Sequence, residues 1–298
     1  MSDTPLPAYG GQAVIEGVMM RGARAVAIAM RDPNNEIVLH TEPLGKIYQS
    51  KIPKLPFLRG LVMLWDAMAL GMRALTISAN MQTEDEEEQI EGPMLYLTLI
   101  ISLSLSIALF FLAPAAVGHY LTDWLKIETA WTANLIEGLV RLLILVGYIS
   151  LIGRMDDIKR VFRYHGAEHK TINAYEDGAE LTPEVVATYP LEHPRCGTAF
   201  LLTVVLFSIL LFTLIGPIGS IWVKLGSRLI LVPVLASISY EYIRWTAKHL
   251  DSPIVQAMIK PNLALQRLTT KEPDLEIIEV GIASFKAMRE KEEEYLVL

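Results

Sequence analysis

The residues best suited to chemistry lie in a polar stretch near the middle of the 298-residue chain. His165 and His169 are four positions apart, and on a helix this spacing places both imidazoles on one face. Glu168 directly precedes the second histidine. The order His-x-x-Glu-His is the inverted form of the zincin motif, in which two histidines hold a metal ion. The pattern predicts a site for one divalent ion, with Glu168 as general base.

A catalytic metal commonly has three protein ligands and one open position, and the sequence offers two candidates for the third. His193 and Cys196, the single cysteine, are three positions apart, so one turn can present both. From these ligand types we predict zinc, with iron and manganese left open. Lys170 and Arg195 would stabilise developing negative charge. Two alternatives remain: a metal-free site, and a polar cluster that only ties this segment to its neighbours.

A glycine-rich segment near the N-terminus, residues 10–22, is the second unusual stretch. Paired glycines permit close backbone approach or positive φ, but the segment matches neither a P-loop nor a dinucleotide fingerprint. In one interpretation Glu16 and Arg21 lie at the histidine site and contact the metal ligands, not the metal ion itself. In the other, which we prefer, they form a surface ion pair at a structural turn. Three further histidines are interpreted as ordinary polar residues: His40, His119 and His249.

Four long apolar segments must position these residues. A helix that crosses a bilayer needs roughly 20 mostly apolar residues, and four ranges meet this requirement: 93–118, 132–153, 199–219 and 228–245. We therefore expect a mainly α protein with a four-helix transmembrane bundle. The histidines would lie in a polar loop over 154–198.

The distribution of Lys and Arg predicts the orientation of these spans. These residues are frequent before the first span, between the second and third, and after the fourth, whereas the two other loops contain only Lys126 and Lys224. Cytoplasmic loops are enriched in Lys and Arg. Both termini and the histidine loop are therefore expected in the cytoplasm.

The N-terminal residues 1–92 are predicted to form a small cytoplasmic α+β module. Two β-prone runs, 25–31 and 36–41, flank turn residues and indicate a hairpin. Residues 56–81 indicate an amphipathic helix that lies on the membrane or packs against the spans. Residues 84–91 are strongly acidic and are interpreted as a solvated linker.

The C-terminal tail, residues 246–298, is expected to be cytoplasmic and to contain a helix over 273–296. The net charge of −7 and the lack of a basic stripe argue against a nucleic-acid partner. One cysteine excludes an internal disulfide framework. Residues 1–9 do not have the pattern of a cleaved signal peptide.

Charged residues inside the predicted spans suggest a further interpretation. Glu137 and Arg141 are four apart and can pair on one helical face, and Glu241 and Arg244 are three apart near the end of the fourth span. The second pair is explained by side chains that extend to the interface. A polar path through the bundle, with Glu137 and Glu241 along it, would instead indicate a small transporter.

Several blocks together resemble the bacterial YqhQ-like family, catalogued as domain of unknown function 1385. They are GGQAVIEGVMMRG, LPFLRGLVMLWDAMALGMRAL, YHGAEHKTINAYE and HPRCGTAFL, and the resemblance extends from Gly10 to the C-terminal helix. It implies a multi-pass protein of the bacterial inner membrane. Members are described as predicted metal-dependent enzymes or as membrane proteins of unknown function, and no substrate follows from the resemblance.

The sequence thus predicts a membrane-embedded, metal-dependent hydrolase at the cytoplasmic face, acting on a lipid or a peptide. The first alternative is a non-enzymatic membrane scaffold or assembly factor, and the second is the small transporter. The expected partner is the lipid bilayer. Self-association into a homo-oligomer is left open, and protein partners are not specified.

Overall fold

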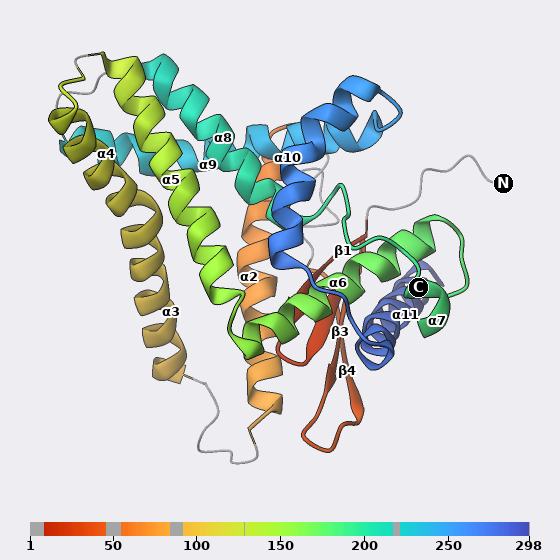
Figure 1. The fold of residues 1–298 in the computed structure, drawn as a ribbon. Coiled ribbons are helices and arrows are strands. Elements are labelled where there is room, and N and C mark those ends of the chain that lie inside the picture. Colours follow the sequence, from red (N-terminus) through yellow and green to blue (C-terminus); the bar gives the residue numbers. More distant parts are fainter. Residues whose placement is uncertain (1–8, 46–54, 84–91, 128, 217–220, 298) are drawn as a thin grey trace.

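The computed structural model describes residues 9–45, 55–83, 92–127, 129–216 and 221–297. The predicted acidic linker 84–91 lies outside these residues, as does the end of the predicted third span. The described part of the chain is mainly helical, with one four-stranded antiparallel sheet close to its beginning (Figure 1).

The sheet has the strand order β1-β2-β3-β4. Its strands are β1 (Gly10–Val14), β2 (Gly17–Arg21), β3 (Ala25–Arg31) and β4 (Ile37–Pro43). The predicted hairpin is confirmed, since β3 pairs with β4 from Ala25↔Pro43 to Arg31↔Ile37. The glycine-rich segment is more than a turn. It forms a first hairpin, β1–β2, with Glu16 at positive φ in its turn.

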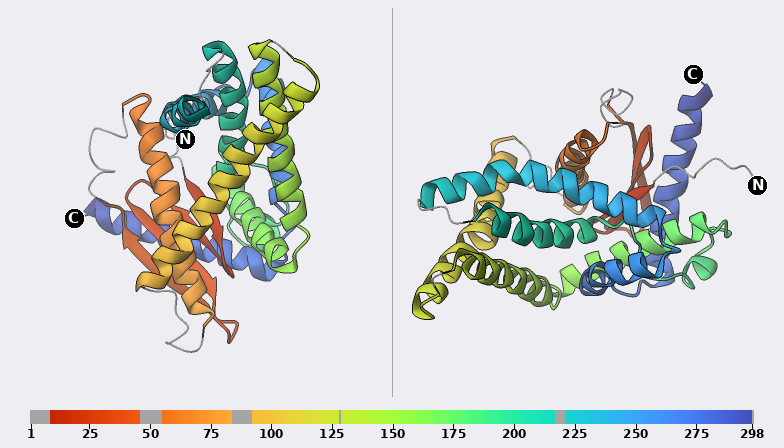
Figure 2. Two further views of the ribbon diagram at one scale, coloured as in Figure 1. Left: turned by 90° about the vertical axis from the view of Figure 1, so that its left-hand side faces the viewer. Right: turned by 90° about the horizontal axis from the view of Figure 1, so that it is seen from above.

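Both faces of the sheet are covered. Residues alternate between the two faces along a strand, so Val18 and Met20 of β2 face one layer while Met19 faces the other. The first layer contains α6 (Asp156–Glu176) and α11 (Leu275–Val297). The second contains α2 (Leu58–Met81). Figures 1 and 2 show the sheet between these helices.

This arrangement differs from the expected N-terminal module. The segment 154–198, expected as a loop, contains α6 and a short helix, α7 (Pro183–Val186). Tyr164 and Ile172 of α6 are fully buried in the same core as Phe285 of α11. The sheet therefore gathers elements from the beginning, the middle and the end of the chain.

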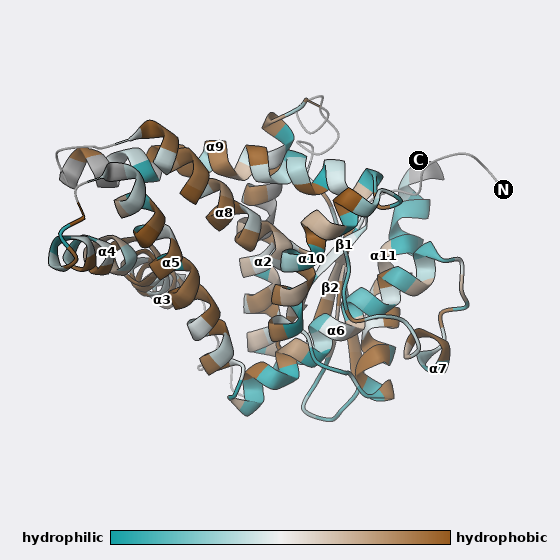
Figure 3. Ribbon diagram, turned by 45° about the horizontal axis from the view of Figure 1, so that its top comes forward, coloured by the Kyte–Doolittle hydropathy of each residue, from teal (hydrophilic) through white to brown (hydrophobic). Residues whose placement is uncertain are grey.

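Among the residues that the structure describes, three helices are long and apolar enough to cross a membrane: Gly92–Trp124, Trp131–Ile152 and Gly197–Ile215. The first comprises α3 (Gly92–Ile107), a π-helical turn η3 (Ala108–Leu112) and α4 (Ala113–Trp124). The others are α5 (Ala130–Ile152) and α8 (Gly197–Ile215). Figure 3 shows the strongly hydrophobic segments of α3, α5 and α8 gathered on the side away from α11. These apolar surfaces indicate association with a membrane.

The predicted fourth span lies within α9 (Ile221–Lys248), which has a proline, Pro233, inside it. This helix carries Lys224, Arg228, Glu241 and Arg244 and is not among the three apolar helices. In Figure 1 it runs across α5 and α8 instead of alongside them. A further helix, α10 (Pro253–Thr269), was not predicted; it packs against α8.

The charged residues of these helices pair partly as predicted. Glu137 and Arg141 form an ion pair of 3.1 Å between Oε1 and Nη2. Glu241 pairs with Arg59 of α2, whose Nε is 2.6 Å from Oε1, so this pair joins α2 to α9.

Candidate metal centre

The two motif histidines lie on one face of α6, as their spacing predicts. Asp156 and Asp157 occupy the first turn of this helix, where acidic side chains stabilise the positive end of the helix dipole. Most of the second half of α6 is buried against the sheet and α11. This packing fixes the orientation of the helix, and the rings of His165 and His169 are 4.4 Å apart between centroids.

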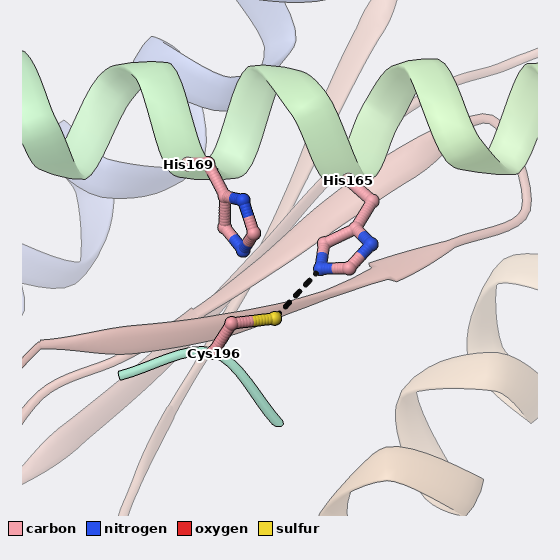
Figure 4. A group of neighbouring side chains, drawn as sticks. All are labelled: His165, His169 and Cys196. Atoms are coloured by element: carbon pink, nitrogen blue, oxygen red, sulfur yellow. Dashed lines mark hydrogen bonds between the residues drawn. The ribbon is translucent and has the colours of Figure 1, made fainter. Parts of the chain in front are cut away.

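Cys196 meets the histidines from another element, because it is the N-cap residue of α8 (Figure 4). Its Sγ accepts a hydrogen bond from the backbone N–H of Thr198 at 3.4 Å and lies 3.3 Å from Nε2 of His165. One ligand atom each from His165, His169 and Cys196 lie within 4.8 Å of one another. Atoms bound to one zinc ion are roughly 3–4 Å apart, so a small inward movement would complete the site.

Backbone carbonyls set the tautomers of both histidines. Nδ1 of His165 donates to the carbonyl oxygen of Thr269 at 2.9 Å, and Nδ1 of His169 donates to that of Leu191. Each Nε2 is therefore left as the metal-binding nitrogen, the arrangement seen around ligating histidines. Nε2 of His169 is buried, and no group in the described part of the chain makes a hydrogen bond with it. A metal ion fits these residues.

The protonation of the three groups is strongly coupled. Burial alone would raise the pKa of Cys196, but the charges of His165 and His169 hold it well below its ordinary value. Burial opposes a proton on His169, yet the Glu168 carboxylate and the Cys196 sulfur raise its pKa to about 9. The helix N-terminus also favours a thiolate. The two histidines therefore favour the thiolate form of Cys196, and the sulfur in turn favours a proton on His169.

Glu168 lies beside the cluster and is only 5% exposed. Its Oε2 is 3.4 Å from Nε2 of His169 and 3.9 Å from Nε2 of His165. Gly11 of β1 packs directly against this side chain, because a Cβ at Gly11 would be 2.7 Å from Cγ of Glu168. The glycine-rich hairpin therefore reaches the site through its backbone.

His193 is close to the cluster but is held differently. Its ring centroid is 5.9 Å from that of His169. Burial, together with the charge of His169, lowers its pKa to about 4, so the ring is neutral. Nδ1 accepts a hydrogen bond from the backbone N–H of Arg195 at 3.4 Å, and Nε2 is 3.5 Å from Oε2 of Glu176. Arg195 also pairs with Glu176.

The structure does not bring the other predicted residues to the ligand atoms. Nζ of Lys170 binds the carbonyls of Ala187 and Tyr189, at 2.8 Å each, and Oε1 of Glu272 at 2.6 Å. Glu16 pairs with Arg160 near the start of α6 instead of with Arg21, which ends β2.

Several residues that shape the site were missed. Thr269 and Leu191 contribute main-chain carbonyls, for which their side chains give no signal. Glu176 is different, because it follows His169 by seven residues. That spacing returns to the same helical face and marks Glu176 as a neighbour of the motif.

Comparisons with known proteins identify a family model and a bacterial protein that are similar to this chain. A family model described as "Protein of unknown function (DUF1385)" matches residues 55–291. The "Uncharacterized protein YqhQ" of Bacillus subtilis (strain 168) is 36% identical over 296 residues, which cover 95% of this chain and 92% of that protein. No solved structure matches the chain.

Proposed function

The chain belongs to the DUF1385 family, and we propose that it is a membrane-bound, metal-dependent hydrolase that works at the cytoplasmic face of the bacterial inner membrane. The observation that carries this proposal is the convergence of His165, His169 and Cys196, with both histidine tautomers set by backbone carbonyls.

The proposed ligands are Nε2 of His165, Nε2 of His169 and Sγ of Cys196. Two imidazoles and one thiolate suit zinc best. Three protein ligands leave one coordination position, and a zinc ion held there would supply a Lewis acid that activates water near neutral pH. The carbonyls of Thr269 and Leu191 orient the imidazoles and raise their basicity.

Glu168 is the proposed general base, since its carboxylate lies within 4 Å of both ligand nitrogens. Gly11 and the β1 strand hold it against that side of the cluster. Arg195 and Glu176 would position His193, which packs against His169. Lys170 has a structural role in this proposal, because its ammonium group already has three oxygen partners.

For the membrane topology we propose four spans, with α9 as the fourth and both termini in the cytoplasm. The distribution of Lys and Arg supports this orientation. Cys196 directly precedes α8, so the metal site would lie where this span enters the cytoplasm. A lipid or a membrane-embedded peptide could reach it there.

Hydrolysis can be tested on purified protein in nanodiscs with added zinc, using p-nitrophenyl butyrate, bis(p-nitrophenyl) phosphate and labelled casein as probes. We expect cleavage of at least one probe by the wild type. Glu168→Gln should keep the metal and lose at least tenfold in rate, and His165→Ala/His169→Ala should lose both. Equal rates in all three proteins, or no cleavage at all, would contradict the hydrolase.

A second candidate, a non-enzymatic scaffold with a structural metal, is favoured by the low exposure of the site. His169 is 1% exposed and Cys196 is 6% exposed, and closed sites are typical of structural zinc. Cobalt-substituted protein distinguishes the two functions. An absorption spectrum that changes on addition of azide indicates an open position, whereas an unchanged spectrum favours the scaffold.

A further inference from the structure

A second charged cluster lies among the apolar helices, away from the metal centre. It contains Glu137 and Arg141 of α5 and Arg228 of α9, which are 3%, 7% and 5% exposed. Oε1 of Glu137 is 3.1 Å from Nη2 of Arg141 and 3.4 Å from Nη2 of Arg228. Two guanidinium groups thus share one carboxylate oxygen.

The charges of this cluster do not balance. Glu137 is the only acidic residue in the sequences of α5 and α8. The acid of α9, Glu241, pairs with Arg59, and the acid of α4, Asp123, is exposed. The two guanidinium charges of the cluster are therefore matched by one carboxylate charge from these helices. A buried charge without a counter-charge is strongly unfavourable in an apolar setting, so an anion from outside would stabilise the cluster.

The hydrogen-bond donors of the two arginines are used unequally. Arg141 donates from Nε to the carbonyl of Phe110 in the π-helical turn, at 3.2 Å, and from Nη1 to Oγ of Ser208 at 3.5 Å. Arg228 stacks on the ring of Phe212, with Cζ 3.5 Å from its centroid. Its buried Nε has no hydrogen-bond partner in the part of the chain that the structure describes. Arg228 therefore retains a donor next to the unbalanced charge.

We propose that Arg228, supported by Arg141, binds an oxyanion of the phosphate type within the apolar helices. A guanidinium matches the planar, multi-oxygen geometry of phosphate better than any other side chain does. The phosphate would come either from the headgroup of an anionic lipid or from solution. Glu137 is seven residues into α5, about 10 Å from the start of that helix, and a long arginine side chain can extend toward the headgroups.

This site is independent of the metal centre. Ser208 follows Cys196 by twelve residues on α8, which corresponds to about 18 Å along the helix. If no anion binds here, the proposal of a hydrolase is unaffected. If the protein is not a hydrolase, the proposal of an anion site is unaffected.

The test compares full-length wild type with Arg228→Met and Arg228→Lys. Arg244→Met is the matched control, because Arg244 is on the same helix and is exposed. In one arm, the apparent Tm in detergent is measured against inorganic phosphate, with sodium chloride at equal ionic strength as reference. In the other, native mass spectrometry counts lipids retained from nanodiscs of phosphatidylglycerol and phosphatidylcholine.

We expect phosphate to raise the Tm of the wild type and of Arg244→Met, or phosphatidylglycerol to be retained selectively by both proteins. Arg228→Met should bind at least tenfold more weakly in the same arm, and Arg228→Lys should bind with intermediate strength. A response in the first arm alone identifies free phosphate, and one in the second alone identifies a lipid headgroup. No response of the wild type in either arm, or an Arg228→Lys variant that binds like the wild type, would overturn the proposal even if Arg228→Met does not fold.

Discussion

The contact between Gly11 and Glu168 leads to a sharp prediction about how the sheet supports the metal centre. A methyl group on Gly11 would lie 2.6 Å from the carbonyl oxygen of Met19 and 2.7 Å from Cγ of Glu168. The first neighbour is backbone of the paired strand and cannot rotate away. Gly11→Ala must therefore shift β1 or displace Glu168, and overpacking of this kind costs about 1–3 kcal/mol.

Gly10→Ala is the matched control, because a Cβ at Gly10 meets nothing within 4 Å on the same strand. In a protein of this size, 1 kcal/mol corresponds to roughly 2–4 °C in Tm. We expect Gly11→Ala to lower the apparent Tm by roughly 2–12 °C on this scale and Gly10→Ala to leave it nearly unchanged. The assay is thermal unfolding in detergent, followed by circular dichroism.

A double variant separates the two neighbours. Glu168→Ala removes one of the two clashing groups, so Gly11→Ala should cost less in that background than in the wild type. Equal Tm values for Gly11→Ala and Gly10→Ala would refute the packing of β1 against α6. An equal cost of Gly11→Ala in both backgrounds would refute the contact with Glu168.

Three further outcomes follow from the contacts of the site. Because the pKa of His169 is raised to about 9, a metal ion must displace a proton below that pH. Zinc affinity should therefore rise about tenfold per pH unit between pH 6 and 8 in competition with a chromophoric chelator, and a flat profile would argue against this protonation state. Lys170→Met leaves the carbonyls of Ala187 and Tyr189 without their donor. This variant should therefore lose about 2–5 kcal/mol in the free energy of unfolding measured with denaturant. A variant that is as stable as the wild type but inactive would instead indicate a catalytic role for Lys170. Arg59 and Glu241 are 16% and 21% exposed, and a double-mutant cycle with Arg59→Met and Glu241→Gln should give a coupling of about 1 kcal/mol, while a coupling of zero would show that α2 and α9 are not joined there.

Local patterns predicted those parts of the fold that depend on one element at a time. The β3–β4 hairpin, α2 and the long C-terminal helix were found because hydrophobic periodicity and turn residues are local signals. The β1–β2 hairpin was missed as strands, because glycine is depleted in strands. Here glycine is needed, since Gly11 and Gly17 lie against neighbouring groups with no room for a Cβ.

The sequence predicted the side chains of the candidate site. It did not predict the contributions of the backbone and of segments distant in sequence. The spacing of His165 and His169 indicated their shared face, and Cys196 was identified as a candidate ligand. The segment around them was expected as a loop, because the sequence of α6 is rich in charged and polar residues and the helix packs on the sheet and α11. The contact between Arg228 and Glu137 was also missed, because these two residues are 91 positions apart in the sequence.

The central claim is that His165, His169 and Cys196 hold one metal ion, and the metal content of the purified protein tests it most directly. Protein produced with added zinc and dialysed without chelator should contain about one zinc per chain by inductively coupled plasma mass spectrometry. His165→Ala/His169→Ala and Cys196→Ser should lose it, while His249→Ala, an exposed histidine outside the site, should keep it. A metal-free wild type, or equal zinc in the wild type and in the His165→Ala/His169→Ala variant, would contradict the account.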